Sequence, residues 1–378
     1  MKVLHVTPSV ARNDGGPAEV IRGLLPALHA CGIQADVLTT DKGLQEYDRD
    51  LLDARWVHVE KGGGPASLTY SASLPRYMKG VIDDYDLVHV HGLQSYVGTQ
   101  AMKLARRAGV PYLLEPHGAL DTYHWRRHAL RKRIYSRAVD RKNWRGLAGV
   151  KYSSGYEARQ GARTLEALTT LVIPLGVDRS LFRIDAVHTT DDAPIILYLG
   201  RITRVKRLDL LLAAMVEEPL RSLNARLIVA GSSDGTLPDP LRFVDRHQIQ
   251  GRVEFMGTVD SAVRTKLMSR ASVFVLPSED ESFGMAVAEA MAAGLPAVVG
   301  ENVGFAAQAA TVGALRLAPQ TSTGLALAIV DALADGAGIG ARARVYAQQH
   351  FTWPNAAAMT VEGYEHILRS GGRRAVHE

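Results

Sequence analysis

The sequence predicts an α/β protein made of two doubly wound domains, and three observations carry that prediction. The chain has 378 residues, which is too long for one compact core and suits two domains. Its hydrophobic content of 47% is typical of a soluble globular protein. Short β-branched runs alternate with Gly- or Pro-rich turns and with stretches of helical spacing. This alternation indicates parallel sheets with helices on both faces.

The first half of the chain begins with a strand and a helix. The run KVLHVTP at 2–8 predicts the strand, and the helix that follows has apolar residues at helical intervals: Val20, Ile21, Leu24, Leu25 and Leu28. Pro26 lies inside this helix and should kink it or reduce its regularity. Further strand candidates follow in the order ADVLTT, RWVHVE, DLVHVHG, PYLLEP, GVKYSS and LVIPLG.

The second half restarts the alternation with PIILYLGR and continues with RLIVAG, RVEFMG, ASVFVLP, PAVVG and ALRLA. Residues 176–194 between the halves are polar and without periodicity, which is typical of a linker. We therefore expect domains at 1–180 and 190–353, with a last helix at about 354–370 that packs back on the first domain. Because open α/β sheets bind ligands at the carboxyl ends of their strands, the two domains should face an interdomain cleft.

Cysteine usage and hydropathy favour a cytoplasmic location. The single cysteine, Cys31, allows no disulfide within the chain, and we expect it to be a small buried apolar residue. The N-terminal run contains His5 and Pro8, which fits a first strand better than a secretory signal. No apolar run reaches the length of a membrane span, so any membrane contact should be peripheral.

The positive charge of the protein is local. Residues 125–145, called here the basic segment, hold nine Lys or Arg and one Asp, a local charge of +8, whereas the whole chain carries +5. The other residues therefore sum to 5 − 8 = −3. A contact with nucleic acid or with an anionic membrane, if there is one, belongs to this segment.

Two glycine- or cation-bearing turns follow predicted first strands. In NDGGPAEV, Gly15 and Gly16 permit close backbone approach, and free amides there could hold a phosphate, although a tight turn explains paired glycines about as often. The missing G-x-G-x-x-G spacing argues against a nicotinamide enzyme. In LGRITRVKRLD, Arg201 and Lys206 lie beyond a strand end and could stabilise a diphosphate leaving group. The alternative is a solvated basic turn.

The stretch SEDESFGMAVAEAMAAGLP at 278–296 carries two glutamates, Glu281 and Glu289, around a predicted helix start. Ser282, Phe283 and Gly284 should lie at the helix N-terminus, where amides and the helix dipole favour phosphate. Eight helical residues rise roughly 12 Å, comparable to the span from a hexose to a ribose. One carboxylate could therefore bind the sugar and the other the ribose. An ordinary helix after a buried strand is the alternative.

Together these motifs resemble glycosyltransferase family 4 (glycosyltransferase group 1). Members of this family are retaining nucleotide-sugar transferases with two Rossmann-like domains, a fold called GT-B. The similarity covers nearly the whole chain: the double-glycine loop, EPHG, IPLGVD, LGRITRVKRLD, VAG, VEFMGTV and above all PSEDESFGMAVAEAMAAGLPAVV. The departures are small: Ser282 and Arg207 stand where glycine is common, and Leu175 where asparagine is common.

The resemblance implies a role for each matching residue. Glu281 would contact the donor sugar, Glu289 the ribose, and the backbone of Ser282, Phe283, Gly284 and Met285 would surround sugar and phosphate. Arg201 and Lys206 match the cations on the diphosphate, Gly16 the amide near it, and His117 the histidine beside the reacting carbon. Neither a cofactor nor a metal ion is implied.

Two other patterns suggest metal binding. His89 and His91 in HVHG alternate along a strand and point the same way, but no acidic third ligand is near them in sequence, so we favour a structural or acceptor-side role. The DRD at 48–50 imitates the D-x-D of a different transferase fold, but it lies in a polar connecting segment and is discounted.

The predicted reaction moves a hexosyl group from a nucleoside diphosphate sugar to a hydroxyl acceptor, with retention, in the synthesis of a cell-surface polysaccharide or glycolipid. The acceptor would be a saccharide or a lipid-linked saccharide, and the basic segment would hold the enzyme on the inner face of the plasma membrane. Two alternatives stay open. A nucleotide-sugar 2-epimerase shares the architecture. A nucleic-acid-binding module built on the basic segment has few interleaved aromatics and no use for the glutamate pair, so we expect no nucleic-acid partner.

Overall fold

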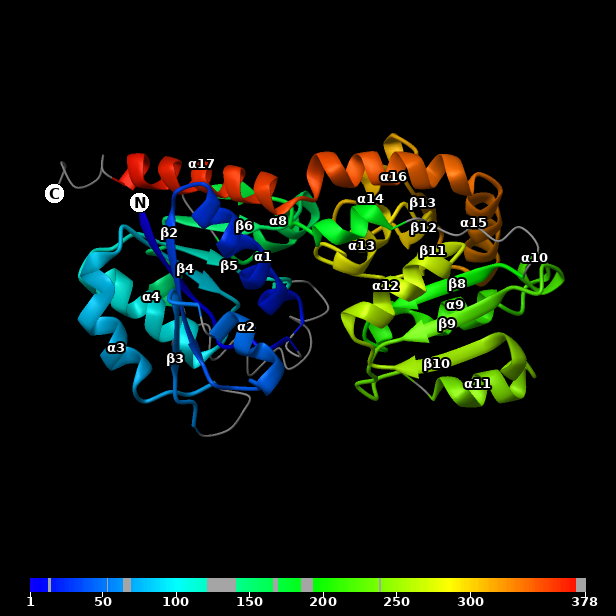
Figure 1. Cartoon of the computed structure of the whole chain (residues 1–378), viewed down its shortest axis with the longest axis horizontal. Coiled ribbons are helices and arrows are strands. Elements are labelled where there is room, and N and C mark those ends of the chain that lie inside the picture. The colour runs from blue at the N-terminus through cyan, green and yellow to red at the C-terminus, as the bar shows by residue number, and fades with distance from the viewer. Residues whose placement is uncertain are drawn as a thin grey trace. The chain divides into compact units, whose positions relative to one another are not determined.

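The computed structural model describes residues 1–12, 15–52, 54–63, 69–120, 141–165, 169–184, 193–237 and 239–371. It forms two compact units (Figure 1). Unit 1 consists of Met1–Gly176 together with Trp353–Glu378, and unit 2 consists of Val177–Thr352.

Unit 1 contains a parallel sheet of seven strands in the order β3-β2-β1-β4-β5-β6-β7. The strands are β1 (Lys2–Val6), β2 (Gln34–Thr40), β3 (Val57–Glu60), β4 (Leu87–His91), β5 (Tyr112–Glu115), β6 (Gly149–Tyr152) and β7 (Thr170–Val172). The chain runs outward in one direction from β1 and then in the other from β4, so the strand order reverses between β1 and β4. Doubly wound sheets bind ligands at this reversal, beyond the carboxyl ends of the strands.

The helices of unit 1 are α1 (Gly16–Ala30), α2 (Arg49–Leu52), α3 (Leu74–Val81), α4 (Tyr96–Ala108), α7 (Arg141–Trp144), α8 (Gly155–Gly161) and α17 (Trp353–Gly371). The last of these, α17, packs along α1 (Figure 1). Their contact is tight, because a Cβ on Gly23 would lie 1.9 Å from the Trp353 ring. Helix α1 continues through Pro26 as far as Ala30.

Unit 2 repeats the plan with a parallel sheet of six strands in the order β10-β9-β8-β11-β12-β13. The strands are β8 (Ile195–Leu199), β9 (Arg226–Ala230), β10 (Val253–Gly257), β11 (Val273–Leu276), β12 (Ala297–Gly300) and β13 (Arg316–Ala318). The helices are α9 (Leu208–Ala214), α10 (Glu218–Ser222), α11 (Pro240–Arg246), α12 (Ser261–Arg270), α13 (Met285–Ala292), α14 (Ala306–Thr311), α15 (Ser322–Ala334) and α16 (Gly336–His350). Here the order reverses between β8 and β11.

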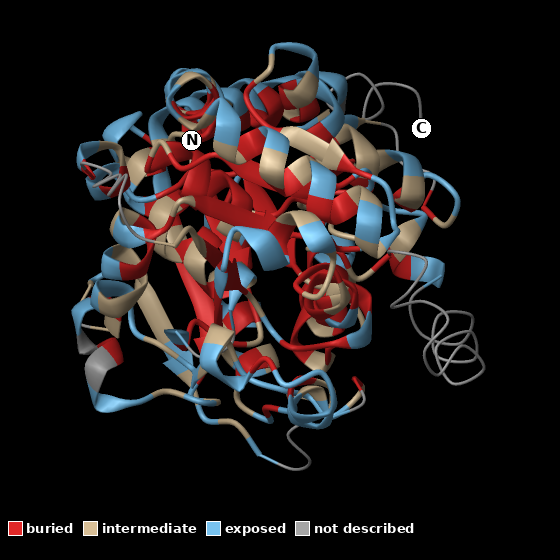
Figure 2. Cartoon of the chain, turned by 90° about the vertical axis from the view of Figure 1, so that its right-hand side faces the viewer, coloured by how far each residue is buried: buried red, intermediate tan, exposed pale blue. Residues whose placement is uncertain are grey.

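These sheets confirm the predicted α/β class, and each predicted strand corresponds to an observed one. The central strands are buried between helices whose outer faces are exposed, whereas the edge strands β3, β7 and β10 are partly exposed (Figure 2). The expectation of a buried cysteine is wrong, since Cys31 caps the C-terminus of α1 and is exposed. The predicted linker begins with a 3-10 turn, Arg179–Arg183, that buries Leu181, and residues 185–192 lie outside the described part.

Among the described helices, none alone has the length and apolar content needed to cross a membrane. Helices α15 and α16 pass that test only as a pair, and they are bent by 89° relative to each other.

Candidate active site

The strand reversal of unit 2 brings two distant motifs together. The turn Arg204–Lys206 follows β8, and the loop from Pro277 to Gly284 follows the adjacent strand β11. The backbone carbonyl of Val205 accepts hydrogen bonds from the Glu279 amide (2.9 Å) and from the Ser278 hydroxyl (3.1 Å). Each loop therefore fixes the other beyond the strand ends, where doubly wound sheets bind ligands.

Lys206 and Glu281 form an ion pair across these two loops. Their side chains are 16% and 19% exposed, so the pair is shielded from bulk water but can be reached from outside. A partly buried charge is costly without a partner, and the pairing supplies one for both side chains. The two residues predicted to contact the diphosphate and the donor sugar thus neutralise each other in this structure.

Arg207 departs from the glycine that is common in the resembling family, and its backbone shows why glycine suits the position. Arg207 has a φ of 54°, in the left-handed region that costs a residue with a Cβ about 1–2 kcal/mol. Its guanidinium is held by Glu279 at 2.5 Å and by Asp209 at 3.2 Å. These two carboxylates are about half exposed, so they hold the guanidinium in place but contribute little to stability.

Glycine is required at the N-terminus of α13. Gly284 caps this helix with a φ of 97°, and a Cβ there would lie 2.8 Å from Val303 Cγ1. Beside it, Phe283 is buried against the rings of Phe305 and Phe351 at centroid distances of 5.1 and 5.4 Å. Packing therefore anchors the loop that carries Ser282 and leads into Met285, the first residue of α13.

One geometric premise of the sequence prediction is wrong. Helix α13 begins at Met285, so Glu281 lies before the helix, in an extended bridge with Val303. The helical rise between Glu281 and Glu289 therefore does not apply to the whole segment. What places Glu281 is the loop itself, since its carbonyl accepts a hydrogen bond from the Gly304 amide at 2.9 Å.

Glu289 lies on α13 with its side chain 11% exposed, and it pairs with Arg264 of α12 at 3.1 Å. The sequence prediction missed Arg264, because nothing in its own surroundings distinguishes it from other surface arginines. Arg201 also follows β8 and is exposed, and within the described residues it pairs with no carboxylate. It is thus available to an anion.

In unit 1 the double glycine lies where predicted, at the start of α1. Gly15 is the N-cap residue, with a φ of 76°, and Gly16 is the first helical residue. A Cβ on Gly16 would meet nothing within 4 Å. Packing therefore does not explain the glycine at position 16, whereas the close approach of a ligand would explain it.

His117 lies in the turn after β5 with a φ of 51°, a conformation that side-chain-bearing residues rarely adopt. The turn is held by the buried carboxylate of Glu157, which accepts from the Gly118 amide at 2.7 Å and from both the amide and the hydroxyl of Ser153 at 2.7 Å. The His117 side chain is 8% exposed. Burial lowers the pKa of His117 against the opposing effect of Glu115, so the imidazole is neutral at neutral pH.

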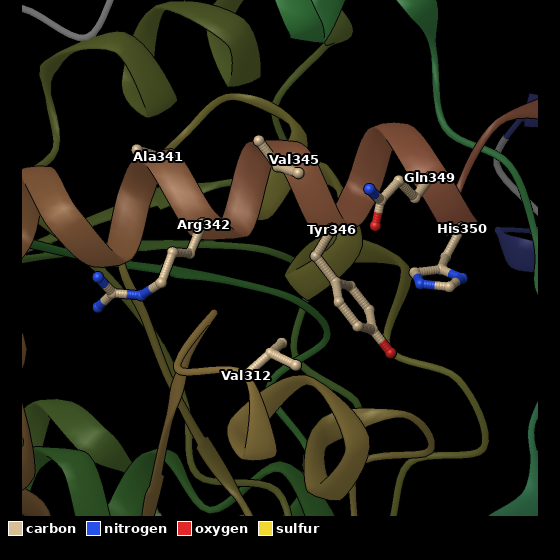
Figure 3. A pocket seen from close by; sticks show the side chains of 7 residues that line it. All are labelled: Val312, Ala341, Arg342, Val345, Tyr346, Gln349 and His350. Carbon is tan, nitrogen blue, oxygen red and sulfur yellow. The ribbon is translucent and has the colours of Figure 1, made fainter.

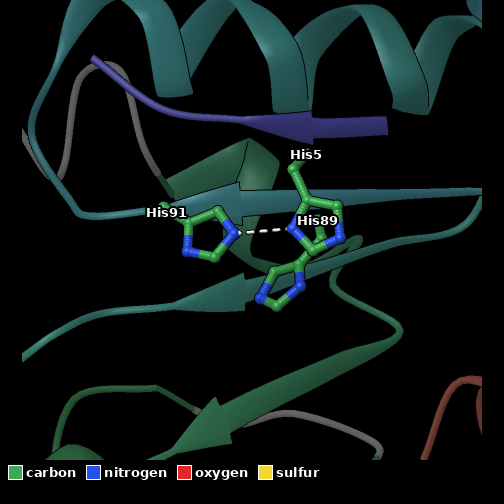
Figure 4. A group of neighbouring side chains, drawn as sticks. All are labelled: His5, His89 and His91. Carbon is green, nitrogen blue, oxygen red and sulfur yellow. Dashed lines mark hydrogen bonds between the residues drawn. The ribbon is translucent and has the colours of Figure 1, made fainter. Parts of the chain in front are cut away.

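A buried histidine cluster surrounds the strand reversal of unit 1 (Figure 4). His5 of β1 lies beside His89 of β4, and His5 Nδ1 is 2.9 Å from His91 Nε2. His89 and His91 do point the same way, as the sequence predicted. The structure supplies the acidic neighbour that the nearby sequence lacks. Glu115 lies on the adjacent strand β5, and its Oε2 is 3.2 Å from His89 Nε2.

Two groups in this cluster could hold a metal ion by distance alone: His5 with His89 and His91, and His91 with Glu115 and His117. The sequence prediction missed His5, Glu115 and the buried Lys151, whose Nζ lies 2.5 Å from Glu115 Oε1. The available signal was the alignment of polar residues on adjacent buried strands. It was weak, because no spacing motif links β1, β4, β5 and β6.

The DRD at 48–50 is explained by arginine pairs. Asp48 is buried and accepts from Arg22 at 2.5 Å, and Asp50 accepts from Arg12 at 2.6 Å. Both carboxylates therefore tie the region around Glu46–Leu52 to α1 and to the chain before it.

A hollow of about 380 Å³ lies elsewhere in unit 2, between α16 and the end of α14 (Figure 3). Its lining is mostly apolar and comprises Val312, Ala341, Arg342, Val345, Tyr346, Gln349 and His350. None of the predicted site residues contributes to it.

Comparison with known proteins gives matches over both units. Residues 193–335 match the family model described as glycosyl transferases group 1, and residues 15–176 match that of a glycosyl transferase 4-like domain. A phosphatidyl-myo-inositol mannosyltransferase of Mycolicibacterium smegmatis is 30% identical over 98% of this chain and 95% of its own. A GDP-mannose:cellobiosyl-diphosphopolyprenol alpha-mannosyltransferase of Xanthomonas campestris is 26% identical over 78% of this chain and 77% of its own.

Among solved structures, Anabaena Alr3699/HepE in complex with UDP and glucose resembles this chain with a TM-score of 0.74 and 20% identity. The likeness covers 97% of this chain and 99% of that one. It shows the fold, two Rossmann-like domains of the GT-B type, as the sequence predicted.

Proposed function

Because the chain belongs to the group 1 glycosyltransferases, we propose that it is a retaining enzyme that moves a hexosyl unit from a nucleoside diphosphate sugar to a hydroxyl acceptor. A nucleoside diphosphate sugar is the donor of the relative that uses GDP-mannose, and UDP and glucose are bound in a protein of the same fold. The proposal assigns the cations and glutamates that bind the donor to unit 2, and it assigns to unit 1 the Gly16 amide near the diphosphate and the histidine beside the reacting carbon.

The observation that carries the proposal is the Lys206–Glu281 pair beside the N-cap of α13. A diphosphate arriving there meets a lysine, the exposed Arg201 and the positive end of a helix dipole. When Lys206 turns to the phosphates, Glu281 is released to accept from the hydroxyls of the sugar. The pair thus keeps both charges satisfied until the donor replaces them as partners.

The chemistry follows from which groups are present. We propose that the bond from the anomeric carbon to the phosphate oxygen breaks while the acceptor oxygen bonds to that carbon from the same face. The departing phosphate takes the proton of the acceptor hydroxyl. Lys206 and Arg201 stabilise the charge that grows on the diphosphate, which is stronger in the transition state than in the bound donor. Neutral His117 lies beside the reacting carbon without adding positive charge there.

The acceptor we propose is lipid-linked, in the synthesis of a cell-surface polysaccharide or glycolipid. Both named relatives act on lipid-borne acceptors, a phosphatidyl-myo-inositol and a cellobiosyl-diphosphopolyprenol. The basic segment, most of which lies outside the described residues, would hold the enzyme at the cytoplasmic, anionic face of the plasma membrane.

The test is transfer by the purified chain from a panel of nucleoside diphosphate hexoses to a lipid-linked saccharide. We expect one donor to yield a product whose new linkage keeps the α configuration of the donor, read from the anomeric proton coupling. A β linkage would overturn the retaining mechanism. Conversion of the donor to an epimer in the absence of acceptor would instead establish the epimerase alternative.

We also expect activity to survive chelation, because Lys206, Arg201 and the α13 terminus supply the positive charge that a divalent ion would otherwise provide. The measurement is the initial rate in excess EDTA. A rate that falls to background and returns with a divalent ion would contradict the metal-free mechanism.

A further inference from the structure

Four described histidines of unit 1, of which His5, His89 and His91 are buried and His117 has a side chain 8% exposed, form one chain that passes through the last described helix. His117 Nε2 is 3.0 Å from His91 Nδ1, and His91 Nε2 is 2.9 Å from His5 Nδ1. The hydroxyl of Tyr364, on α17, then joins His5 Nε2 (3.4 Å) to His89 Nδ1 (2.7 Å). Each of these hydrogen bonds needs one proton, which is carried by one of its two atoms.

Glu115 determines the direction at one end. Burial alone would raise the pKa of Glu115, but Lys151 and the neighbouring histidines hold that pKa well below its usual range, so the group is a carboxylate. A carboxylate only accepts hydrogen bonds. Its Oε2 lies 3.2 Å from His89 Nε2, and neither atom makes an aligned hydrogen bond within the described residues, so their contact is electrostatic. Of the ring nitrogens near this carboxylate, His89 Nε2 is the nearest, because His91 Nδ1 and His117 Nδ1 lie at 3.6 and 3.7 Å. An Nε2 lone pair would be repelled by the carboxylate oxygen, so electrostatics place the proton of His89 on Nε2 and leave Nδ1 as an acceptor.

The proton position on His89 determines which atom donates in each following hydrogen bond of the chain. Tyr364 has one hydroxyl proton and donates it to His89 Nδ1, the nearer partner, so its oxygen is free to accept from His5 Nε2. His5 Nδ1 then accepts from His91 Nε2, and His91 Nδ1 accepts from His117 Nε2. This arrangement uses every link and makes all four histidines the Nε2–H tautomer.

The opposite direction fails at one point. In the fully reversed chain, His89 Nδ1 donates to Tyr364, Tyr364 donates to His5 Nε2, and His5 and His91 donate onward from Nδ1, so every internal link is again made. The reversed chain instead turns the Nε2 lone pair of buried His89 toward the carboxylate oxygen of Glu115 3.2 Å away, which is electrostatically unfavourable. A metal ion bound by His5, His89 and His91 would also have to displace links that these nitrogens already make.

We propose that Glu115 and the Tyr364 hydroxyl are positioning residues: together they fix the proton positions in this chain and hold His117 as the neutral Nε2–H tautomer. Helix α17 thus controls a histidine that lies at the far end of the network. The proton assignment stands on the geometry, and its consequence for catalysis rests on the proposed role of His117.

The first test reads the protons directly and needs no activity. Two-bond nitrogen–proton correlation spectra of the ¹⁵N-histidine-labelled protein distinguish protonated from unprotonated ring nitrogens, and His→Gln variants assign the signals. We expect Nε2–H at His5, His89, His91 and His117. An Nδ1–H tautomer at His5, His91 or His117 overturns the proposal, as does a zinc titration that moves these signals stoichiometrically.

The second test removes the hydroxyl. Tyr364→Phe leaves His5 Nε2 without an acceptor, so His5, His91 and His117 can reverse together and place the proton of His117 on Nδ1, which lies 3.7 Å from Glu115 Oε1. His89 should keep Nε2–H. The matched control is Tyr112→Phe, which removes another buried hydroxyl of unit 1, one that donates to the Asn143 carbonyl. The control should leave all four tautomers unchanged.

Kinetics then test the positioning role. We expect Tyr364→Phe to lower kcat at least tenfold with the donor KM within twofold of wild type, and Tyr112→Phe to change neither. A reversed tautomer with unchanged kcat overturns the positioning role although the network is real. Wild-type protein that transfers from no donor would mean that the proposed function has failed, and the spectra would still decide the network. If Tyr364→Phe does not fold, the wild-type spectrum decides alone.

Discussion

Glu281 is the residue whose loss should affect transfer most. In Glu281→Gln the side chain keeps its shape but loses the charge that would accept from the donor sugar, and a hydrogen bond to a charged group is worth about 1.5–3 kcal/mol. We therefore expect kcat to fall by roughly tenfold to a hundredfold or more. The measurement is steady-state transfer together with a thermal melt that shows the fold is intact.

The control for Glu281→Gln is Asp331→Asn, which removes a carboxylate that also pairs with an arginine in unit 2 but stands 62% exposed outside the site. Its rate should equal that of wild type. Transfer by Glu281→Gln within twofold of wild type would remove Glu281 from the reacting centre.

Gly16 offers a cleaner test of phosphate binding, because its position is open in this structure. Gly16→Ala puts a methyl group where the diphosphate would approach the start of α1, without any clash in the free protein. We expect the donor Kd to rise at least tenfold while the melting temperature is unchanged or slightly higher, since alanine favours a helix more than glycine does. Isothermal titration with the donor measures the first quantity.

The matched control is Gly80→Ala, a substitution in α3 that also meets nothing within 4 Å. It should leave the donor Kd as in wild type. Equal donor affinity in Gly16→Ala and Gly80→Ala would show that the double glycine is only a turn.

For single residues, the sequence predicted which side chains belong to the site better than it predicted the side chains that pair with them. Lys206 and Glu281 were recognised from the motifs around them, but their pairing depends on the adjacency of β8 and β11, which no local pattern encodes. Arg264 and Tyr364 were missed for the same reason. Each acts on a residue far away in sequence, Glu289 or His89, and each lies in an otherwise ordinary helix.

Strands were the most predictable elements, because buried parallel strands read as short continuous apolar runs between turns. Polar residues inside such runs were harder to interpret. His5, His89 and His91 look like interruptions of β1 and β4, yet they are fully buried, and hydrogen bonds join His5 to His91 and His89 to Tyr364. The N-terminus of α13 lies where the sequence predicted, with Gly284 as its N-cap, but the acidic residues before Gly284 belong to the loop that precedes the helix.

The buried histidines of these strands predict an acid-sensitive fold. Burial lowers the pKa of His89 to about 4, and it lowers the pKa values of His5, His91 and His117 as well. In the unfolded chain these groups titrate near about 6.5. Between these values the unfolded state binds more protons than the folded state, so the free energy of unfolding must fall as the pH is lowered through this window.

Each histidine contributes up to about 1.4 kcal/mol per pH unit to that slope. We expect urea unfolding at a series of pH values to show stability that is steady above about pH 7 and falls steeply between about pH 6.5 and about pH 4. A free energy of unfolding that stays constant across the window would mean that the four rings are charged or exposed in the native protein.

At the scale of the whole molecule, the sequence predicted two doubly wound domains from the repeated alternation, and this is confirmed. The limits of each unit depend on where the chain packs. Unit 2 begins at Val177, directly after the run LVIPLG that the sequence predicts as a strand. Helix α17 joins unit 1 through its contacts with α1. Sequence periodicity shows that α17 is amphipathic, but it does not identify α1 as the partner.

Membrane attachment through the basic segment remains a prediction of the sequence. Three of its cations, Arg141, Lys142 and Arg145, are exposed on and just after α7, so they can be changed without disturbing the core. Each Lys or Arg near an anionic surface contributes about 1 kcal/mol. Replacing all three by glutamine should therefore weaken partitioning onto anionic liposomes by about 3 kcal/mol, roughly a hundredfold.

Sedimentation with liposomes measures the effect, with neutral liposomes and added salt as conditions that should abolish binding of the wild type. Glutamine at Arg242 and Arg246, exposed cations of unit 2, is the control for a general change in charge. If the wild type binds anionic liposomes and the triple variant of α7 does not, the attachment is electrostatic and belongs to the basic segment, because the unit 2 variant retains binding with nearly the same net charge. Equal partitioning of the wild type onto anionic and neutral liposomes would contradict the attachment, and the acceptor would then have to reach the enzyme from solution.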